Sequence, residues 1–305
     1  MRSILTLCDL TGGEIERIFA ITEDLKSKYE KGLRESLLPG RVVALLFEKP
    51  SLRTRVSFEA AIAHLGGSSM MLGKEAGFGS RESTADFGRV LSQYVDAIVV
   101  RAFHHEMVAE LADHCTCAVI NGLTDLAHPC QALADLFTLR ELIGDVRGKI
   151  LAYVGDANNV ARSLALGCGK VGMRMAIATP KGYGFDDAFV ELLGRETPEL
   201  QLTQSSDPTE VVAGAVAVYT DVWTSMGQEK EKQARKRAFA DFQVNAKLMA
   251  SAPADAYFMH CLPAHRGEEV AAEVIDGPNS VVVQQAGNRL HAQKGVLAWL
   301  LGAMG

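Results

Sequence analysis

The sequence predicts an α/β protein with two domains, each a mostly parallel sheet with helices on both faces. Short apolar runs alternate with longer amphipathic stretches along nearly the whole chain, which is typical of strand–helix–strand units in parallel sheets. The length of 305 residues exceeds that of most single domains, so two are expected. A polar segment with a glycine at each end, Gly144 to Gly148, separates a helical stretch from an apolar run, and we place the domain boundary there.

The individual elements follow from this alternation. The apolar runs predict strands at 41–47, 68–72, 96–101, 117–120, 149–154, 173–178, 199–203, 215–219, 256–261 and 280–284. The amphipathic stretches predict helices at 12–31, 53–65, 83–94, 104–113, 129–143, 159–171, 185–195, 208–213, 228–251 and 286–301. The expected domains are 1–144 and 148–284, with a C-terminal helix in 285–305 that packs back on the first domain.

Composition limits the possible functions. With 48% hydrophobic and 22% charged residues, the chain has the composition of a globular protein. A net charge of −6 and a pI of about 5.8 argue against a general binder of nucleic acid or anionic membrane. Residues 1–20 contain no apolar signal core, and the six cysteines are scattered. We therefore expect reduced thiols, a cytoplasmic location and no membrane partner.

One short segment concentrates positive charge and hydroxyl groups directly after an apolar run. Ser51, Arg53, Thr54 and Arg55 stand at the predicted start of a helix, where unpaired backbone amides and the helix dipole attract anions. The Arg53 guanidinium suits phosphate or carboxylate oxygens. Arg55 lies two positions on and points elsewhere, so we expect it to form an ion pair with Glu59. Ser51 alone is equally explained as a helix N-cap.

Three later apolar runs also end in polar residues, at the edge where parallel sheets bind ligands. The loop from Gly155 to Asn159 lacks the GxGxxG pattern of a dinucleotide site. Asp221 follows the run 215–219. His260 and Cys261 are neighbours on a predicted strand and so point to opposite faces, which disfavours a Cys–His nucleophilic pair.

Two other features have simpler explanations. The run from Glu229 to Arg237, EKEKQARKR, predicts a solvated helix face with i,i+4 ion pairs. Histidines and cysteines also gather between residues 104 and 117, but without the regular spacing of a zinc site. We expect neither a metal nor a cofactor.

The segment SLRTR resembles the carbamoyl-phosphate signature of the aspartate/ornithine carbamoyltransferases. The resemblance recurs in order through VVRAF, HPCQ, GDANN, DVWTSMG, HCLP and GNRLHAQ, which together extend along nearly the whole chain. It implies that Arg53, His128 and Cys261 are catalytic. It also implies a carbamoyl-phosphate site made of Ser51, Leu52, Arg53, Thr54, Arg101, His128, Gln131, Cys261, Leu262 and Arg289.

The same resemblance implies an amino-acid site in the second half of the chain. Asp221 meets the substrate amine, Ser225 and Met226 shape the pocket, and Asn159 holds the ornithine backbone, with Asn158 as the near alternative. Cys261 lies near the attacking amine. Either its thiolate or the phosphate accepts the amine proton, and both alternatives stay open.

The resemblance implies transfer of a carbamoyl group to L-ornithine, giving citrulline and phosphate in arginine metabolism, by a homotrimer that binds no nucleic acid. The match departs in the loop 73–83, which has no glutamine where the family contributes one to a neighbouring subunit. Gly77 stands near that place, so Lys74, Ser80 or Arg81 must complete the phosphate site. This departure keeps three alternatives open: an N-acylornithine substrate, putrescine as the substrate, or an inactive paralogue that only binds phosphate ligands. Aspartate is disfavoured, because SMG and HCLP are the ornithine-type forms.

Overall fold

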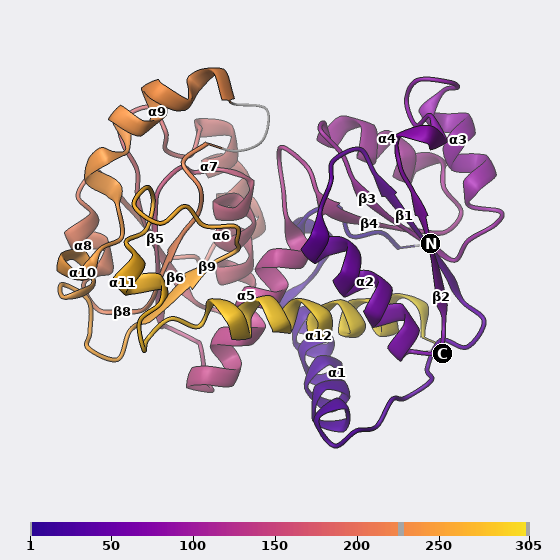
Figure 1. Ribbon diagram of the computed structural model, residues 1–305, viewed down its shortest axis with the longest axis horizontal. Helices are drawn as coiled ribbons and strands as arrows, with labels where there is room; N and C mark the ends of the chain where they lie inside the picture. Colours follow the sequence, from indigo (N-terminus) through magenta and orange to yellow (C-terminus); the bar gives the residue numbers. More distant parts are fainter. Residues whose placement is uncertain (1, 225–228, 303–305) are drawn as a thin grey trace. The chain divides into compact units, whose positions relative to one another are not determined.

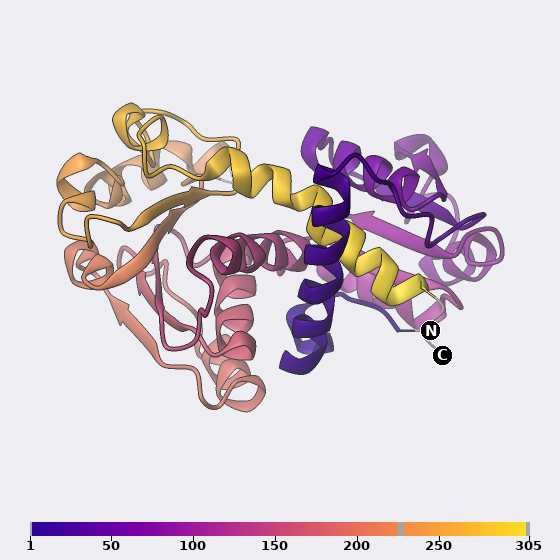
Figure 2. The same ribbon diagram turned by 90° about the horizontal axis from the view of Figure 1, so that it is seen from below.

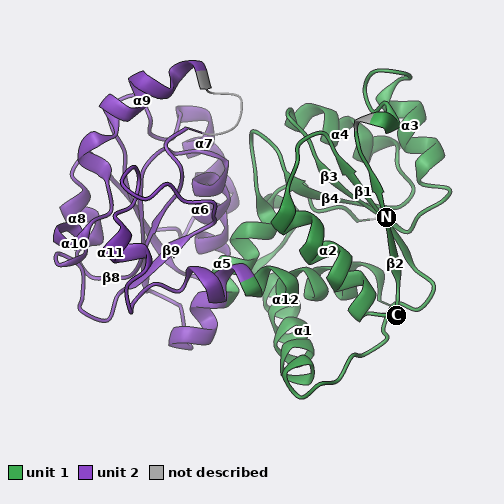
Figure 3. Cartoon of the chain, viewed as in Figure 1, with its two compact units in different colours: residues 1–137, 287–305 green, residues 138–286 purple. Residues whose placement is uncertain are grey.

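The computed structural model describes residues 2–224 and 229–302. The chain forms two compact units, one of residues 1–137 with 287–305 and the other of residues 138–286 (Figure 3). One division falls inside the helix α5 (Pro129–Ile143), whereas we had placed it in the polar segment 144–148, and the other falls inside α12 (Val282–Leu301). Most of the last helix is therefore grouped with the first unit.

The first unit contains a four-stranded parallel sheet in the order β2-β1-β3-β4 (Figure 1). Its strands are β1 (Val42–Phe47), β2 (Ser68–Leu72), β3 (Ala97–Arg101) and β4 (Ala118–Leu123). Its other helices are α1 (Gly12–Glu30), α2 (Leu52–His64), α3 (Thr84–Leu91) and α4 (His105–His114), with short 3-10 turns at Leu7–Asp9 and Lys74–Ala76. β3 is buried along its whole length, as expected for a parallel strand covered on both faces.

The second unit contains a five-stranded parallel sheet in the order β7-β6-β5-β8-β9. The strands are β5 (Ile150–Val154), β6 (Arg174–Ala178), β7 (Leu202–Ser205), β8 (Ala215–Thr220) and β9 (Tyr257–His260). The helices are α6 (Asn159–Val171), α7 (Asp187–Glu196), α8 (Pro208–Val212), α9 (Lys232–Ala238), α10 (Ala246–Met249) and α11 (Ala272–Ile275), with 3-10 turns at Glu229–Glu231 and Ala240–Phe242 (Figure 2). The strand order reverses between β5 and β8, and such a switch point is where open parallel sheets bind ligands.

Two predicted elements were wrong. The run 280–284 is not a strand, because α12 begins at Val282 and the backbone forms only an isolated bridge between Ser280 and Phe258. A short apolar run of this kind does not distinguish a strand from the first turn of a buried helix. The stretch 228–251 is not one helix either, since α9, α10 and two short 3-10 turns follow one another between Glu229 and Met249.

No helix in the described part of the chain combines the length and the apolar composition needed to cross a membrane.

Candidate active site in two parts

The first part lies at the carboxyl end of β1. α2 begins there, and its N-cap Ser51 accepts a hydrogen bond from the Thr54 amide at 3.3 Å. Arg55 Nε lies 2.9 Å from Glu59 Oε1, so the predicted local ion pair is confirmed. Arg53 stands in the first turn, half-buried, and its guanidinium has no recorded partner among residues 2–224 and 229–302. One arginine of the pair is thus occupied and the other is available to a ligand.

Arg289 joins residues from three helices. Its Nη1 donates to Gln131 Oε1 at 2.5 Å, and its Nη2 donates to Thr54 Oγ1 at 3.2 Å. Gln131 in turn donates to Asp135 at 2.8 Å. All four side chains are buried. Thr54, Gln131 and Arg289 are far apart in the sequence, and all three were predicted to bind carbamoyl phosphate. In the structure their side chains contact one another.

Arg101 and His128 complete this part of the site. Arg101 is buried at the end of β3, where the register with β4 shifts. His128 is buried directly before α5, whose first residue is proline. Burial, and then the charges of Arg289 and Arg101, hold the pKa of His128 well below its usual range. The imidazole is therefore neutral, and it can bind a carbonyl oxygen through N–H without adding charge.

Lys49 is a cation that the sequence analysis missed. Its side chain is buried, and its Nζ lies 4.2 Å from the centre of the Phe103 ring. Burial, and then the charge of Arg101, lower the pKa of Lys49. The available signal in the sequence was a lysine directly before Pro50 and the cluster of residues 51–55.

The loop that lacks the family's glutamine borders a cavity of about 220 Å³. The cavity is lined by Leu46, Phe47, Phe78 and Phe103, with Glu48 and Ser80 as polar groups. Gly77 has a φ of +71°, and a Cβ built there would lie 2.3 Å from Arg81 Cδ. The stem of Arg81 therefore occupies the space into which a side chain at position 77 would extend. Ser80 Oγ donates to the Gly77 carbonyl, and the Lys74 side chain lies outside the described part of the structure.

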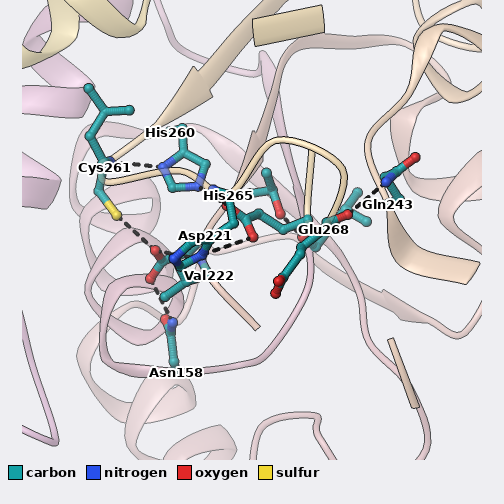
Figure 4. A network of polar contacts seen from close by, with 12 residues as sticks. Asn158, Asp221, Val222, Gln243, His260, Cys261, His265 and Glu268 are labelled. Carbon is teal, nitrogen blue, oxygen red and sulfur yellow. Dashed lines mark hydrogen bonds and ion pairs between the residues drawn. The ribbon is translucent and has the colours of Figure 1, made fainter. Parts of the chain in front are cut away.

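The second part of the site surrounds Asp221, which follows β8. Its Oδ1 accepts hydrogen bonds from the Val222 amide at 2.8 Å and from Cys261 Sγ at 3.0 Å. Its Oδ2 accepts one from Asn158 Nδ2 at 2.8 Å (Figure 4). These residues follow β5, β8 and β9, which are adjacent in the sheet. Three strand ends therefore orient one buried carboxylate.

Asn158 makes several hydrogen bonds within the protein. It caps α6 by accepting from the amides of Val160 and Ala161, while its amide group holds Asp221. Asn159 is the first residue of the helix and, like Asn158, is half-buried. The assignment of Asn159 to an amino-acid backbone stays a prediction. Ser225 and Met226 lie outside the described residues.

The predicted separation of His260 and Cys261 on opposite faces is wrong, because β9 ends at His260 and Cys261 lies beyond the strand. His260 has a ring nitrogen within 4.8 Å of both Cys261 Sγ and a carboxylate oxygen of Asp221. Its Nδ1 accepts from the Leu262 amide at 2.8 Å, and its Nε2 lies 3.3 Å from Glu269 Oε1. Burial opposes ionisation of Glu269, but hydrogen bonds from His260 and the His265 amide still hold its pKa below the usual value. The pair supports Leu262, which has a φ of +56°, and so shapes the turn that carries Cys261.

Comparison with known proteins identifies the family. The carbamoyl-P binding domain of the aspartate/ornithine carbamoyltransferases matches residues 2–141, and their Asp/Orn binding domain matches residues 147–300. The chain belongs to this family. Its own two compact units correspond to these two domains of the family in order along the chain, apart from the last helix.

Within the family, the chain is 51% identical to the ornithine carbamoyltransferase of Anoxybacillus flavithermus, over 98% of this chain and 96% of that protein. It is 47% identical to the anabolic ornithine carbamoyltransferase of Pyrococcus furiosus, over 99% of this chain and 97% of that protein. The solved structure of the ornithine carbamoyltransferase from Pyrococcus furiosus superposes with a TM-score of 0.96, covering 100% of this chain and 98% of that one at 47% identity. The structure from Thermus thermophilus gives a TM-score of 0.89 at 42% identity and covers 99% of each chain.

Proposed function

We propose that this protein transfers the carbamoyl group of carbamoyl phosphate to the side-chain amine of L-ornithine, giving L-citrulline and phosphate. The observation that carries this proposal is the carboxylate of Asp221, held by Cys261 and Asn158 at three adjacent strand ends. It is an oriented acceptor for a cationic or neutral amine. The high full-length identity to ornithine carbamoyltransferases supports the same substrate.

The first part of the site suits the electrophile. Attack on carbamoyl phosphate places negative charge on the carbonyl oxygen and then on the departing phosphate. Arg53, Arg101 and Arg289 offer fixed positive charge, and the amides at the start of α2 add donors. The neutral imidazole of His128 donates to the carbonyl oxygen, and buried Gln131 lies beside it in the first turn of α5. These groups are already in place, so little reorganisation accompanies the reaction.

The second part suits the nucleophile. A side-chain amine of this kind has a reference pKa of about 10.4 and must lose a proton before it attacks. Asp221 orients the amine but favours its charged form. Cys261 Sγ lies 3.0 Å from Asp221 Oδ1, so a thiolate at this position would face the carboxylate. Of the two proton acceptors left open by the sequence, this favours the phosphate of the bound substrate.

A ureido-product assay tests the proposal. The purified protein is incubated with carbamoyl phosphate and one amine at a time: L-ornithine, N-acetylornithine, putrescine, L-lysine or L-aspartate. We expect the highest kcat/KM with L-ornithine and a product with the mass of citrulline. A preference for N-acetylornithine or putrescine would show that the substrate assignment is wrong, while the assignment of carbamoyl transfer would stand. Binding of carbamoyl phosphate without turnover of any amine would identify an inactive paralogue, and turnover of aspartate alone would refute the assignment of the amine site.

The biological setting and the assembly are further parts of the proposal. We place the reaction in arginine biosynthesis in the cytoplasm, in keeping with the anabolic relative. We also propose a homotrimer. Leu52 and Val56 lie one turn apart on α2 and are 75% and 50% exposed, an apolar strip suited to a second copy of the chain. Light scattering combined with size-exclusion chromatography measures the mass, and a monomer at micromolar concentration would contradict the trimer.

A further inference from the structure

Arg235 does not behave as its sequence context predicts. It belongs to the charged run from Glu229 to Arg237, for which we expected a solvated helix face. Most of the described side chains in this run are exposed, but Arg235 is only 4% exposed. A single arginine therefore turns inward from an otherwise solvated segment, and an inward charge requires partners.

Besides Glu231 of its own run, whose Oε2 lies 3.6 Å from Nη1, its partners belong to two loops that carry the amine site. Nε of Arg235 donates to the Trp223 carbonyl at 2.6 Å, and Nη2 forms an ion pair with Asp156. Trp223 follows β8, two residues after Asp221, and Asp156 follows β5, two residues before Asn158. Asn158 and Asp221 are themselves hydrogen bonded. The two loops are thus joined twice, once at the substrate-facing carboxylate and once through this guanidinium.

The packing around Arg235 keeps its orientation fixed. Its guanidinium carbon lies 5.0 Å from the centre of the Tyr183 ring and 5.6 Å from that of Phe239. The Tyr183 carbonyl also accepts a hydrogen bond from the Ala157 amide at 3.0 Å, in the same loop as Asp156. A planar fork packed against two rings can hold two acceptors at once, whereas a lysine ammonium lacks this shape.

The charge of Arg235 matters as well as its shape. Burial raises the pKa of Asp156, the nearby charge of Asp221 adds to that rise, and Arg235 opposes it. Without the guanidinium, two acidic groups on neighbouring loops would share a partly buried region, with only the weaker charge effect of Arg162 to offset them at Asp156. Repulsion would then separate the loops, or Asp156 would take up a proton.

We propose that Arg235 is a positioning residue for the amine site, because it joins the loop after β5 to the loop after β8 and so sets the orientation of Asp221. It touches neither the carboxylate of Asp221 nor the residues assigned to carbamoyl phosphate. This inference rests on the proposed function for its kinetic readout. Its effect should therefore fall on use of the amine and not on binding of carbamoyl phosphate.

The test compares Arg235→Lys, Arg235→Gln and Asp156→Asn with the control Arg237→Gln, which removes an exposed charge from the same run. Steady-state kinetics are measured with ornithine varied at saturating carbamoyl phosphate, and carbamoyl-phosphate affinity is measured by calorimetry. We expect KM for ornithine to rise about 10- to 100-fold in Arg235→Gln and less in Arg235→Lys, since small displacements of positioning groups have effects of this order. The affinity for carbamoyl phosphate should match that of wild type in every variant. The control Arg237→Gln should also keep the wild-type KM for ornithine and the wild-type thermal midpoint.

The double variant Arg235→Gln/Asp156→Asn sharpens the result. Because both single changes break the same ion pair between Arg235 and Asp156, the rise in KM of the double variant should be smaller than the product of the two single rises. An unchanged KM in folded Arg235→Gln, or an equal loss of affinity for both substrates, would overturn the inference.

A crystal structure of Arg235→Gln gives a readout that does not depend on the substrate. The contact of 2.8 Å between Asn158 and Asp221 should lengthen or break, and its retention would overturn the inference. If wild type fails to use ornithine at all, the proposed function fails, while this crystallographic result still decides the role of Arg235. Should Arg235→Gln not fold, Asp156→Asn provides the same measurement.

Discussion

Cys261 Sγ lies 3.0 Å from Asp221 Oδ1 and donates a hydrogen bond to it. The two residues stand 40 positions apart and follow neighbouring strands of one sheet. A thiolate in this position would face a carboxylate, so the pair describes a thiol that orients an acid. Its function should therefore depend on a donor at position 261 and not on a nucleophilic sulfur.

This relationship predicts an order among Cys261 variants. Cys261→Ser keeps a donor for Asp221 and should lose less kcat/KM for ornithine than Cys261→Ala, which leaves that lone pair without its partner. We expect about a tenfold difference between the two variants, corresponding to a hydrogen bond to a charged group. Initial rates at several ornithine concentrations measure it. Equal activity of the two variants would show that the thiol hydrogen is not important.

Asp221→Asn should affect the amine more than carbamoyl phosphate. The carboxylate accepts three hydrogen bonds within the protein, and an amide in its place presents a donor toward groups that also donate. We expect KM for ornithine to rise by at least about tenfold, since a hydrogen bond to a charged group contributes about 1.5–3 kcal/mol. Calorimetry with carbamoyl phosphate is the comparison. Equal weakening of both ligands would mean that Asp221 has a structural role only.

Arg53 and Arg55 form a matched pair for testing the phosphate site. Arg55 is paired with Glu59, and Arg53 has no recorded partner among the described residues. Arg53→Ala should lower kcat about 10²- to 10³-fold, the usual loss when one charge-stabilising donor is removed. Arg55→Ala changes the net charge equally and should stay within about threefold, since an exposed i,i+4 pair contributes little. Near-normal turnover of Arg53→Ala would refute its assignment.

Any side chain introduced at Gly77, in the loop that lacks glutamine, should lower the free energy of unfolding. Gly77 and Gly144 have nearly the same backbone conformation, with φ of +71° and +72°, but only Gly77 faces a neighbour, the stem of Arg81. Alanine at either position should destabilise the protein by about 1–2 kcal/mol through its positive φ. Gly77→Ala should lose about 1 kcal/mol more through the close contact. Urea unfolding measures both variants, and the excess should vanish when Arg81→Ala is added.

Acid should destabilise the first unit through its buried histidines. Burial, and then cations led by Lys294, lower the pKa of His291 to about 3, whereas the unfolded value is about 6.5. Between these values the unfolded chain binds one more proton, so this contribution to stability is complete above pH 6.5 and decreases as pH falls toward 3. His291→Gln should flatten the fall in urea midpoint between pH 7.5 and 5. His104→Gln, at an exposed position, is the control, and identical slopes in all three proteins would contradict the prediction.

Local elements could be predicted from the sequence because their causes lie within a few residues. The helices 129–143 and 159–171 have the bounds expected, since Pro129 opens the first and Asn158 and Gly172 enclose the second. The Arg55–Glu59 pair depends only on helical spacing. The ordered series of motifs likewise identified the family, because each motif is a short local pattern.

Only the tertiary structure decided which side chains face one another. Arg289 meets Thr54 across 235 positions, and Cys261 meets Asp221 across 40. Arg235 looked like part of a solvated run and is buried, and the apolar run at 280–284 became the first turn of a helix. The periodicity of apolar residues indicates which helix or strand a segment can form. The burial and the partners of its side chains depend on the other segments that pack beside it in the fold. For this protein the sequence therefore determined most of the elements and the family, and the packing of strand ends determined how the site is oriented.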